Sequence, residues 1–366
     1  MLFPYQYVPH TMERMQEFID FIFYQVWCKA PGNGPFHLDL FNGNPALKEV
    51  MTAFFYDHTK GGDFFYGHVE RIYGRFALLN PAQIDQFKQW YHANNDIEKV
   101  CANDPDLQLA RYVDIGPIHE ELSGQLATFF KGLYSKELLD LAIVRQKIGD
   151  IDDHYDHFIT ENRAGKCPFC GMADMLSAYH AYREAYDHYL PKALYPFNSI
   201  NFKNLVPSCH HCNSTYKSSQ DPAYTPKDPA RSAARRKMFY PYANADYTLE
   251  IKIELRTSDI AHLTPADIEL EFGPAALNEE IDTWKDVYGI EERYRAKCCS
   301  DSDGKYWLQQ VLDEWKEDGR SPADFLTTLT RQAFKSPFAD NNFLKKAFLE
   351  SCDRIGLFNA DEEAFE

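Results

Sequence analysis

The sequence has no long apolar run and no secretory leader pattern. No stretch of its 366 residues approaches the roughly 18 consecutive apolar residues that a membrane-spanning helix needs. The first residues, MLFPYQYVPHTMERMQ, lack a basic segment followed by an apolar core, which is the pattern of a signal peptide. We therefore expect a cytoplasmic globular protein with no membrane partner. Its 45 % hydrophobic content is ample for a packed core.

The number and spacing of the cysteines do not suit a disulfide framework. The chain has nine cysteines, an odd number, and four of them form two C-x-x-C pairs. Such spacing is typical of metal ligands in a reducing compartment. The other five are expected to pack as small apolar side chains.

Positive charge is scarce, since 38 Lys and Arg oppose 55 Asp and Glu and the net charge is -17. This deficit argues at first against nucleic acid, because phosphate binding draws on Lys and Arg. Between Thr160 and Tyr240, however, eleven basic residues stand against six acidic ones, so this segment carries +5 and the remainder -22. The acidic flanks either keep the protein soluble or repel nucleic acid until a partner covers them.

Apolar periodicity predicts an α+β fold that is predominantly α. Thr11 is the expected N-cap of a helix over residues 12–27, and one long helix is expected over residues 135–160. The alternating segment 247–255 and the segment 268–272 are expected to form a short hairpin. Further helices are expected at 45–57, 63–79, 81–94, 118–133, 277–299, 306–318, 322–335 and 341–354.

We divide the chain into three regions on this basis. They are a helical N-terminal region (1–160), a compact core with the C-x-x-C pairs (161–222), and a C-terminal region (223–366) with a short β hairpin followed by helices. The last region begins with a proline-rich stretch and a short cationic run.

The two pairs Cys167-Pro-Phe-Cys170 and Cys209-His-His-Cys212 predict a structural zinc site. Each C-x-x-C turn directs two thiolates at one ion, and two such turns complete a tetrahedral sulfur set with no open position. Redox-active or merely buried cysteines are the alternative. His210 and His211 are read as turn residues or DNA contacts rather than as zinc ligands.

Between and after these pairs, the chain reads as strand, loop, strand and helix. Residues 186–189 suit one strand, residues 203–209 a second, and residues 213–217 the start of a helix. This frame contains D-H-Y-L-P-K, then I-N-F-K-N-L-V-P-S-C-H-H-C-N. Together with the first C-x-x-C pair, these residues resemble the HNH endonuclease family, whose core is a ββα-metal fold. The resemblance covers about fifty to sixty residues.

The resemblance implies roles for four residues. His188 is implied as the general base, a task that suits a side chain with a near-neutral pKa. Asp187 and Asn213 are implied as ligands of a catalytic Mg²⁺ or Mn²⁺, and Asn204 as the residue that orients the His188 ring. Asn213 stands where the family often has histidine. Contacts with nucleic acid are expected from four cationic residues: Lys192, Lys217, Arg235 and Arg236.

The resemblance therefore implies a metal-dependent HNH endonuclease that hydrolyses DNA, with a core held together by the predicted zinc site. By analogy with other proteins of the family, we expect a regulated antiviral defence or restriction effector whose acidic flank docks an ATPase or sensor protein. Two alternatives stay open. One is an RNA-cleaving HNH toxin, and the other is an inactive zinc module that binds nucleic acid or protein.

Overall fold

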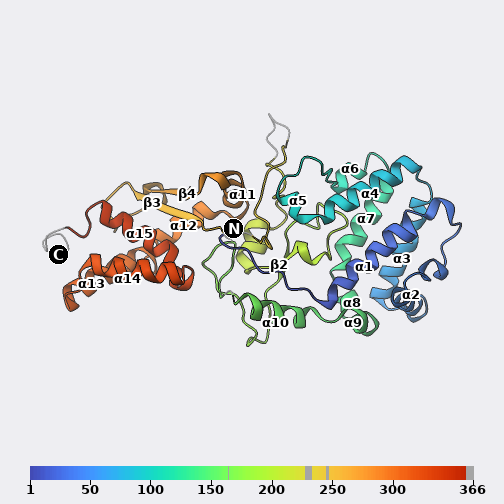
Figure 1. Ribbon diagram of the computed structural model, residues 1–366, viewed down its shortest axis with the longest axis horizontal. Coiled ribbons are helices and arrows are strands. Elements are labelled where there is room, and N and C mark those ends of the chain that lie inside the picture. Colours follow the sequence, from blue (N-terminus) through green and yellow to red (C-terminus); the bar gives the residue numbers. More distant parts are fainter. Residues whose placement is uncertain (164, 227–232, 245–246, 360–366) are drawn as a thin grey trace. The chain divides into compact units, whose positions relative to one another are not determined.

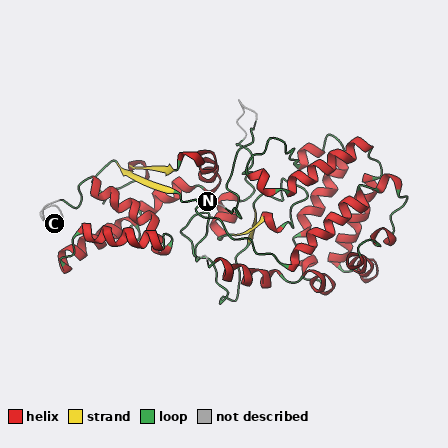
Figure 2. Ribbon diagram, in the orientation of Figure 1, coloured by secondary structure: helices red, strands yellow, loops and turns green. Residues whose placement is uncertain are grey.

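The computed structural model describes residues 1–163, 165–226, 233–244 and 247–359 (Figure 1). Helices dominate these residues, and the strands form small antiparallel pairs (Figure 2). The prediction of a mostly helical α+β protein is confirmed at that level. The chain divides into two compact units. We call Tyr5–Arg163 with Leu176–Asn244 the helical unit, and Met1–Pro4, Ala164–Met175 and Ala245–Glu366 the hairpin unit.

The helical unit is built from a series of helices and one short strand pair. Its helices are α1 (Arg14–Phe21), continued by the π-helical segment η2 (Ile22–Trp27), α2 (Pro45–Asp57), α3 (Lys60–Phe76), α4 (Pro81–Asn95), α5 (Ile97–Cys101), α6 (Tyr112–Ile115), α7 (Glu120–Leu133), α8 (Lys136–Leu139), α9 (Ala142–Ile148) and α10 (Ile151–Asn162). The strands β1 (Tyr186–His188) and β2 (Leu205–Pro207) follow, and the π-helical segment η6 (His211–Lys217) comes directly after β2.

Local sequence explains where several helices begin. Asn44 and Asn80 each precede a proline, and each side chain accepts a hydrogen bond from the third backbone N–H of its helix. Proline suits the first helical position because its missing N–H would have no partner there. At the N-terminus, Thr11 is not the cap: His10 takes that role and accepts from the N–H of Met12. The predicted cap was therefore wrong by one residue.

Aromatic side chains fill the core of the helical unit. Trp27 is fully buried, and its ring lies 5.8 Å from Phe76 and 5.5 Å from Phe129, measured between centroids. The indole N–H donates to the backbone oxygen of Val69 over 3.0 Å, so its polar group is satisfied. These contacts bring together η2, α3 and α7.

The single helix predicted over residues 135–160 is three helices in the structure, α8, α9 and α10. Gly149 ends α9 with φ of 81°. This left-handed conformation interrupts the helical backbone, and glycine adopts it without steric cost. Apolar periodicity persists across such a break, so the sequence pattern alone reads as continuous.

The hairpin unit has a β hairpin packed on helices. Strand β3 (Glu250–Leu255) pairs antiparallel with β4 (Ile268–Gly273), in a register that places Glu250 opposite Gly273. The helices are α11 (Asn278–Tyr288), α12 (Ile290–Cys299), α13 (Gly304–Asp318), α14 (Pro322–Lys335) and α15 (Asn342–Arg354). Helix α15 contacts β3, where Ser351 Oγ accepts from the N–H of Leu255. The predicted hairpin is confirmed.

Candidate metal centre and active site

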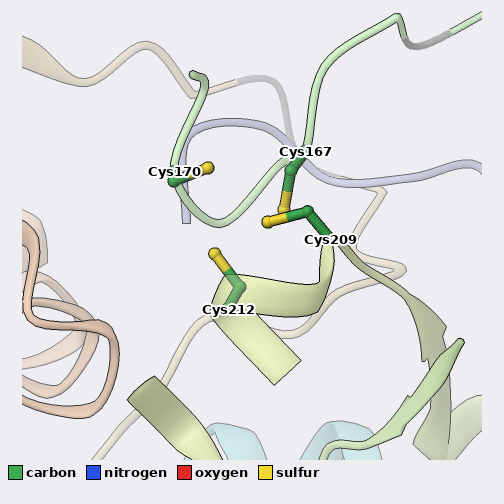
Figure 3. A group of neighbouring side chains, drawn as sticks. All are labelled: Cys167, Cys170, Cys209 and Cys212. Carbon is green, nitrogen blue, oxygen red and sulfur yellow. The ribbon is translucent and has the colours of Figure 1, made fainter. Parts of the chain in front are cut away.

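Four cysteine side chains point toward one another in a buried cluster (Figure 3). The sulfurs of Cys167, Cys170, Cys209 and Cys212 all lie within 4.8 Å of one another. Regular tetrahedral zinc coordination with Zn–S distances of about 2.3 Å places sulfurs about 3.8 Å apart. Buried thiols at this spacing fit zinc. His210 and His211 are both exposed and do not belong to the cluster.

The turn that carries Cys167 and Cys170 is held by backbone hydrogen bonds and by two aromatic side chains. Gly171 N–H donates to the Cys167 oxygen over 2.7 Å. Trp284 donates its indole N–H to the Phe169 oxygen, and the Tyr294 hydroxyl donates to the Cys170 oxygen. Gly171 has φ of 68°, and a Cβ there would lie 2.5 Å from a Leu2 methyl carbon. Glycine is therefore required at this position.

The pair Cys209 and Cys212 follows β2 and opens η6. Strand β2 pairs antiparallel with β1, so that Asp187 faces Val206 and His188 faces Leu205. The order of elements is strand, loop, strand and helix, as the sequence pattern predicts. This arrangement places Asp187 and His188 on β1 and Asn213 in η6.

His188 is held by one ring nitrogen. Its Nε2 lies 2.9 Å from the backbone oxygen of Ser199. A carbonyl only accepts, so Nε2 carries the proton, and Nδ1 of the neutral ring keeps a lone pair. Burial, followed by the charges of Lys192 and Lys217, lowers the pKa of His188 to about 3. The ring is thus neutral at pH 7, which is the form that accepts a proton.

Asn204 forms hydrogen bonds to the backbone of the connection between β1 and β2, and none of its bonds among the described residues goes to the His188 ring. Its Oδ1 accepts from the N–H of Leu190 over 2.7 Å. Its Nδ2 donates to the oxygens of Leu190 and Asn198, over 3.1 and 3.2 Å. Asn198 immediately precedes Ser199, the partner of His188. Any effect of Asn204 on the ring therefore passes through the backbone of this loop.

Asp187 forms a buried ion pair with Lys217. Its Oδ1 lies 2.9 Å from Lys217 Nζ, which also donates to the His188 oxygen over 2.8 Å. Asp187 Oδ2 is buried and has no hydrogen-bond partner among the described residues. Burial raises the pKa of Asp187, and Lys217 opposes that change. The unpartnered oxygen is a hard donor of the kind that Mg²⁺ or Mn²⁺ takes, while the other oxygen already faces a cation.

Asn213 is half-buried, and its N–H donates to the Cys209 oxygen over 3.0 Å. Its side-chain oxygen is the other donor type that such an ion accepts. Asp187 Oδ2 and the Asn213 side chain are thus oxygen donors of the type that a divalent ion accepts.

The four predicted nucleic-acid contacts lie in different surroundings. Lys217 is fully buried, so a phosphate contact would require its pair with Asp187 to open. Lys192 is half-buried, and its Nζ lies 5.6 Å from the centre of the Tyr134 ring. Arg235 donates to the backbone oxygens of three residues near α5, which gives it a structural role: Val100, Asp104 and Leu107. Arg236 lines a cavity described below.

Sequence reasoning missed two residues that position His188. Ser199 acts through its backbone oxygen, so its side-chain identity carries no signal. Tyr134, at the end of α7, packs edge-on against the His188 ring with 5.0 Å between centroids. Tyr134 lies 54 positions before His188 in the chain, so no local sequence pattern could predict this contact.

No helix among residues 1–163, 165–226, 233–244 and 247–359 is long and apolar enough to cross a membrane. No protein-family model, curated protein or solved structure matches this chain.

Proposed function

We propose that this chain is a metal-dependent endonuclease of the HNH type that hydrolyses phosphodiester bonds in DNA. The observation that carries the proposal is the pairing of His188 Nε2 with the Ser199 carbonyl, which leaves Nδ1 of the neutral ring as a proton acceptor on the strand that also carries Asp187. The strand, loop, strand and helix order around these residues supports the same reading.

In the proposed reaction, His188 Nδ1 takes a proton from the attacking water. The new P–O bond forms as the bond to the 3′ oxygen breaks, and that oxygen leaves as a hydroxyl after it is protonated. The products are a 5′-phosphate and a 3′-hydroxyl. Positive charge opposite the phosphoryl oxygens would come from Mg²⁺ or Mn²⁺ held by Asp187 and Asn213. Zinc in the four-cysteine cluster would be structural.

One feature supports this assignment over a zinc module without activity. Asp187 Oδ2 is buried with no hydrogen-bond partner among the described residues, which is costly unless a ligand such as a metal ion completes the site.

The test compares wild type with His188→Ala on plasmid DNA and on total RNA. Each reaction is run with Mg²⁺, with Mn²⁺ and with EDTA, and the exposed His92→Ala serves as a matched control. We expect DNA cleavage that requires the metal, survives His92→Ala and disappears in His188→Ala with zinc content unchanged. Equal cleavage by wild type and His188→Ala would refute the assignment, and cleavage of RNA alone would identify the RNA-cleaving alternative.

We further propose that activity is regulated in a defence or restriction setting, with an ATPase or sensor protein docked on the acidic flanks. The support is the charge division, +5 over residues 160–240 and -22 over the rest. The negative charge outside residues 160–240 would weaken DNA binding until a partner covers it. Full, unregulated cleavage by the purified monomer would contradict this part of the proposal.

A further inference from the structure

A cavity of about 650 Å³ lies within the helical unit. Its wall includes Arg111, the segment Ala193–Leu194 between β1 and β2, the segment 220–226 after η6, and Arg236. Its volume falls within the roughly 300–1,000 Å³ of small-molecule sites. The same β1–β2 connection that holds His188 thus also contributes to a second concave site.

The charged groups of this cavity leave one guanidinium weakly paired. Both oxygens of Asp221 lie 2.8 Å from the Tyr195 hydroxyl, and Oδ1 also accepts from the N–H of Ala223. Arg111 lies 3.9 Å from Asp221 and 3.7 Å from Asp114, beyond hydrogen-bond distance in both cases.

Arg111 Nε is buried and has no hydrogen-bond partner in the part of the chain that the structure describes. The Arg111 side chain as a whole is 30 % exposed, so the rest of its guanidinium is open to an anionic acceptor that enters the cavity. Arg236 adds a second cation to the wall, and its Nε and Nη2 donate to the backbone oxygens of Pro222 and Asp221. These bonds fix its guanidinium in place.

An aromatic ring lies beside the weakly paired guanidinium. The Arg111 Cζ is 4.4 Å from the centre of the Tyr224 ring, which is half-buried at the cavity wall. Tyrosine rings and arginine planes both stack on nucleobases, and arginine forks pair with phosphate. A ligand with both a phosphate and a base matches this combination.

We propose that this cavity binds one nucleotide unit, with the phosphate at Arg111 and Arg236 and the base on Tyr224. The unit is either a free nucleotide or one residue of a nucleic-acid strand, since both present the same chemistry. The inference goes beyond the endonuclease activity and does not rest on it, because binding here needs neither His188 nor a divalent ion.

The experiment measures binding to the full-length protein in EDTA. A fluorescent short oligothymidylate is titrated first, and dTMP, ATP and inorganic phosphate are then tested as competitors and by direct calorimetry. Arg111→Ala should weaken binding about 10- to 100-fold, because it removes a charge-assisted hydrogen bond. Tyr224→Ala should weaken it at least about fivefold, and Tyr224→Phe should leave it unchanged. The matched control is Arg145→Ala, which removes an arginine outside the cavity that pairs with Asp140 and Asp150.

Binding of dTMP or ATP that depends on Arg111 would identify a free nucleotide as the ligand, and dependence seen only with the oligonucleotide would identify a strand. The inference is overturned if Arg111→Ala binds every probe as well as Arg145→Ala does, or if no probe binds wild type. Should Arg111→Ala fail to fold, Arg111→Lys keeps the charge but loses the planar fork, and an intermediate loss is expected. Loss of cleavage in His188→Ala with this binding intact separates the two proposals.

Discussion

Asp187 and Lys217 form an ion pair whose side chains are 3 % and 0 % exposed, with 2.9 Å between Oδ1 and Nζ. The pair connects β1 with η6 through two residues that lie 30 positions apart in the chain. Lys217 also donates to the His188 oxygen, so one ammonium group holds both residues of the Asp-His pair. The buried ammonium group of Lys217 therefore stabilises the candidate active site.

Removal of Lys217 should destabilise the helical unit strongly. Lys217→Met leaves the Asp187 carboxylate buried without its counterion, and we expect a loss of about 3–5 kcal/mol in the free energy of unfolding. Asp187→Asn combined with Lys217→Met should lose less than Lys217→Met alone, since no unpaired charge stays buried. Urea unfolding measures both, with the exposed Lys203→Met as control. A Lys217→Met protein as stable as the control would show that the pair does not hold β1 and η6 together.

Substitution of Asn204 should disturb the loop that holds His188. Asn204→Ala removes three buried hydrogen bonds to the backbone of Leu190 and Asn198, for an expected cost of about 2–4 kcal/mol. Asn204→Asp keeps the acceptor but loses both donors, and it should be at least as damaging. Cleavage rates and urea midpoints are measured together. Normal cleavage by either variant would mean that the Ser199 carbonyl keeps its position without Asn204.

Zinc content should depend on the cysteine cluster alone. We expect about one zinc ion per chain in the wild type, and much less after Cys212→Ser, because four thiolates complete the tetrahedral set. Folding and metal binding are coupled in such sites, so a chelator should also lower the melting temperature. Cys28→Ser is the matched control, since Cys28 is a buried cysteine outside the cluster. Equal zinc loss in both variants would contradict the assignment.

Tyr134 should support His188 through its ring and not through its hydroxyl. The hydroxyl is buried without a hydrogen-bond partner among the described residues, so Tyr134→Phe is expected to be neutral or slightly stabilising. Tyr134→Ala removes the edge-on contact at 5.0 Å and leaves space beside His188. We expect lower cleavage with unchanged zinc content. If Tyr134→Ala cleaves as fast as Tyr134→Phe, the ring has no positioning role.

Acid should destabilise the helical unit through His154. This side chain is 2 % exposed, its Nδ1 accepts from the Tyr186 hydroxyl, and its Nε2 faces the Val8 oxygen at 3.3 Å. Burial first, and then the nearby His10, lower its pKa from 6.5 to about 4. Between pH 6.5 and about pH 4, His154 is protonated in the unfolded chain but still neutral in the folded protein. The free energy of unfolding therefore falls as the pH drops below about 6.5.

Over the whole range from above pH 6.5 to below pH 4, protonation of His154 should lower the free energy of unfolding by about 3 kcal/mol. Urea unfolding at pH 7 and pH 5 should therefore show a loss in wild type that is smaller in His154→Gln. The exposed His92→Gln should behave as wild type. A pH dependence identical in His154→Gln and wild type would assign the acid sensitivity to other groups.

The sequence correctly predicted structural features that depend only on residues close together in the chain. The helix starts at Pro45, Pro81 and Pro322 follow from a capping residue with proline at the next position. The β3–β4 hairpin follows from alternation, and the four cysteines from their spacing. The breaks at Gly149 and Gly289 were missed, because both residues adopt positive φ inside a continuous apolar pattern. The sequence pattern does not show whether a glycine has positive or negative φ, because tertiary packing decides its backbone conformation.

The sequence by itself determined the cysteine pairs, the Asp187-His188 step, the mainly helical character and the basic segment in an acidic chain, because each is a property of composition or short spacing. The tertiary structure decided which groups meet. In the folded protein Lys217 pairs with Asp187, and Nε2 of His188 bonds to the Ser199 carbonyl. Tyr134 packs against the His188 ring. Arg111, Tyr224 and Arg236 line one cavity. These contacts join residues that are 11 to 125 positions apart. Only the free energy of packing the whole unit selects them, since no local propensity acts over that distance.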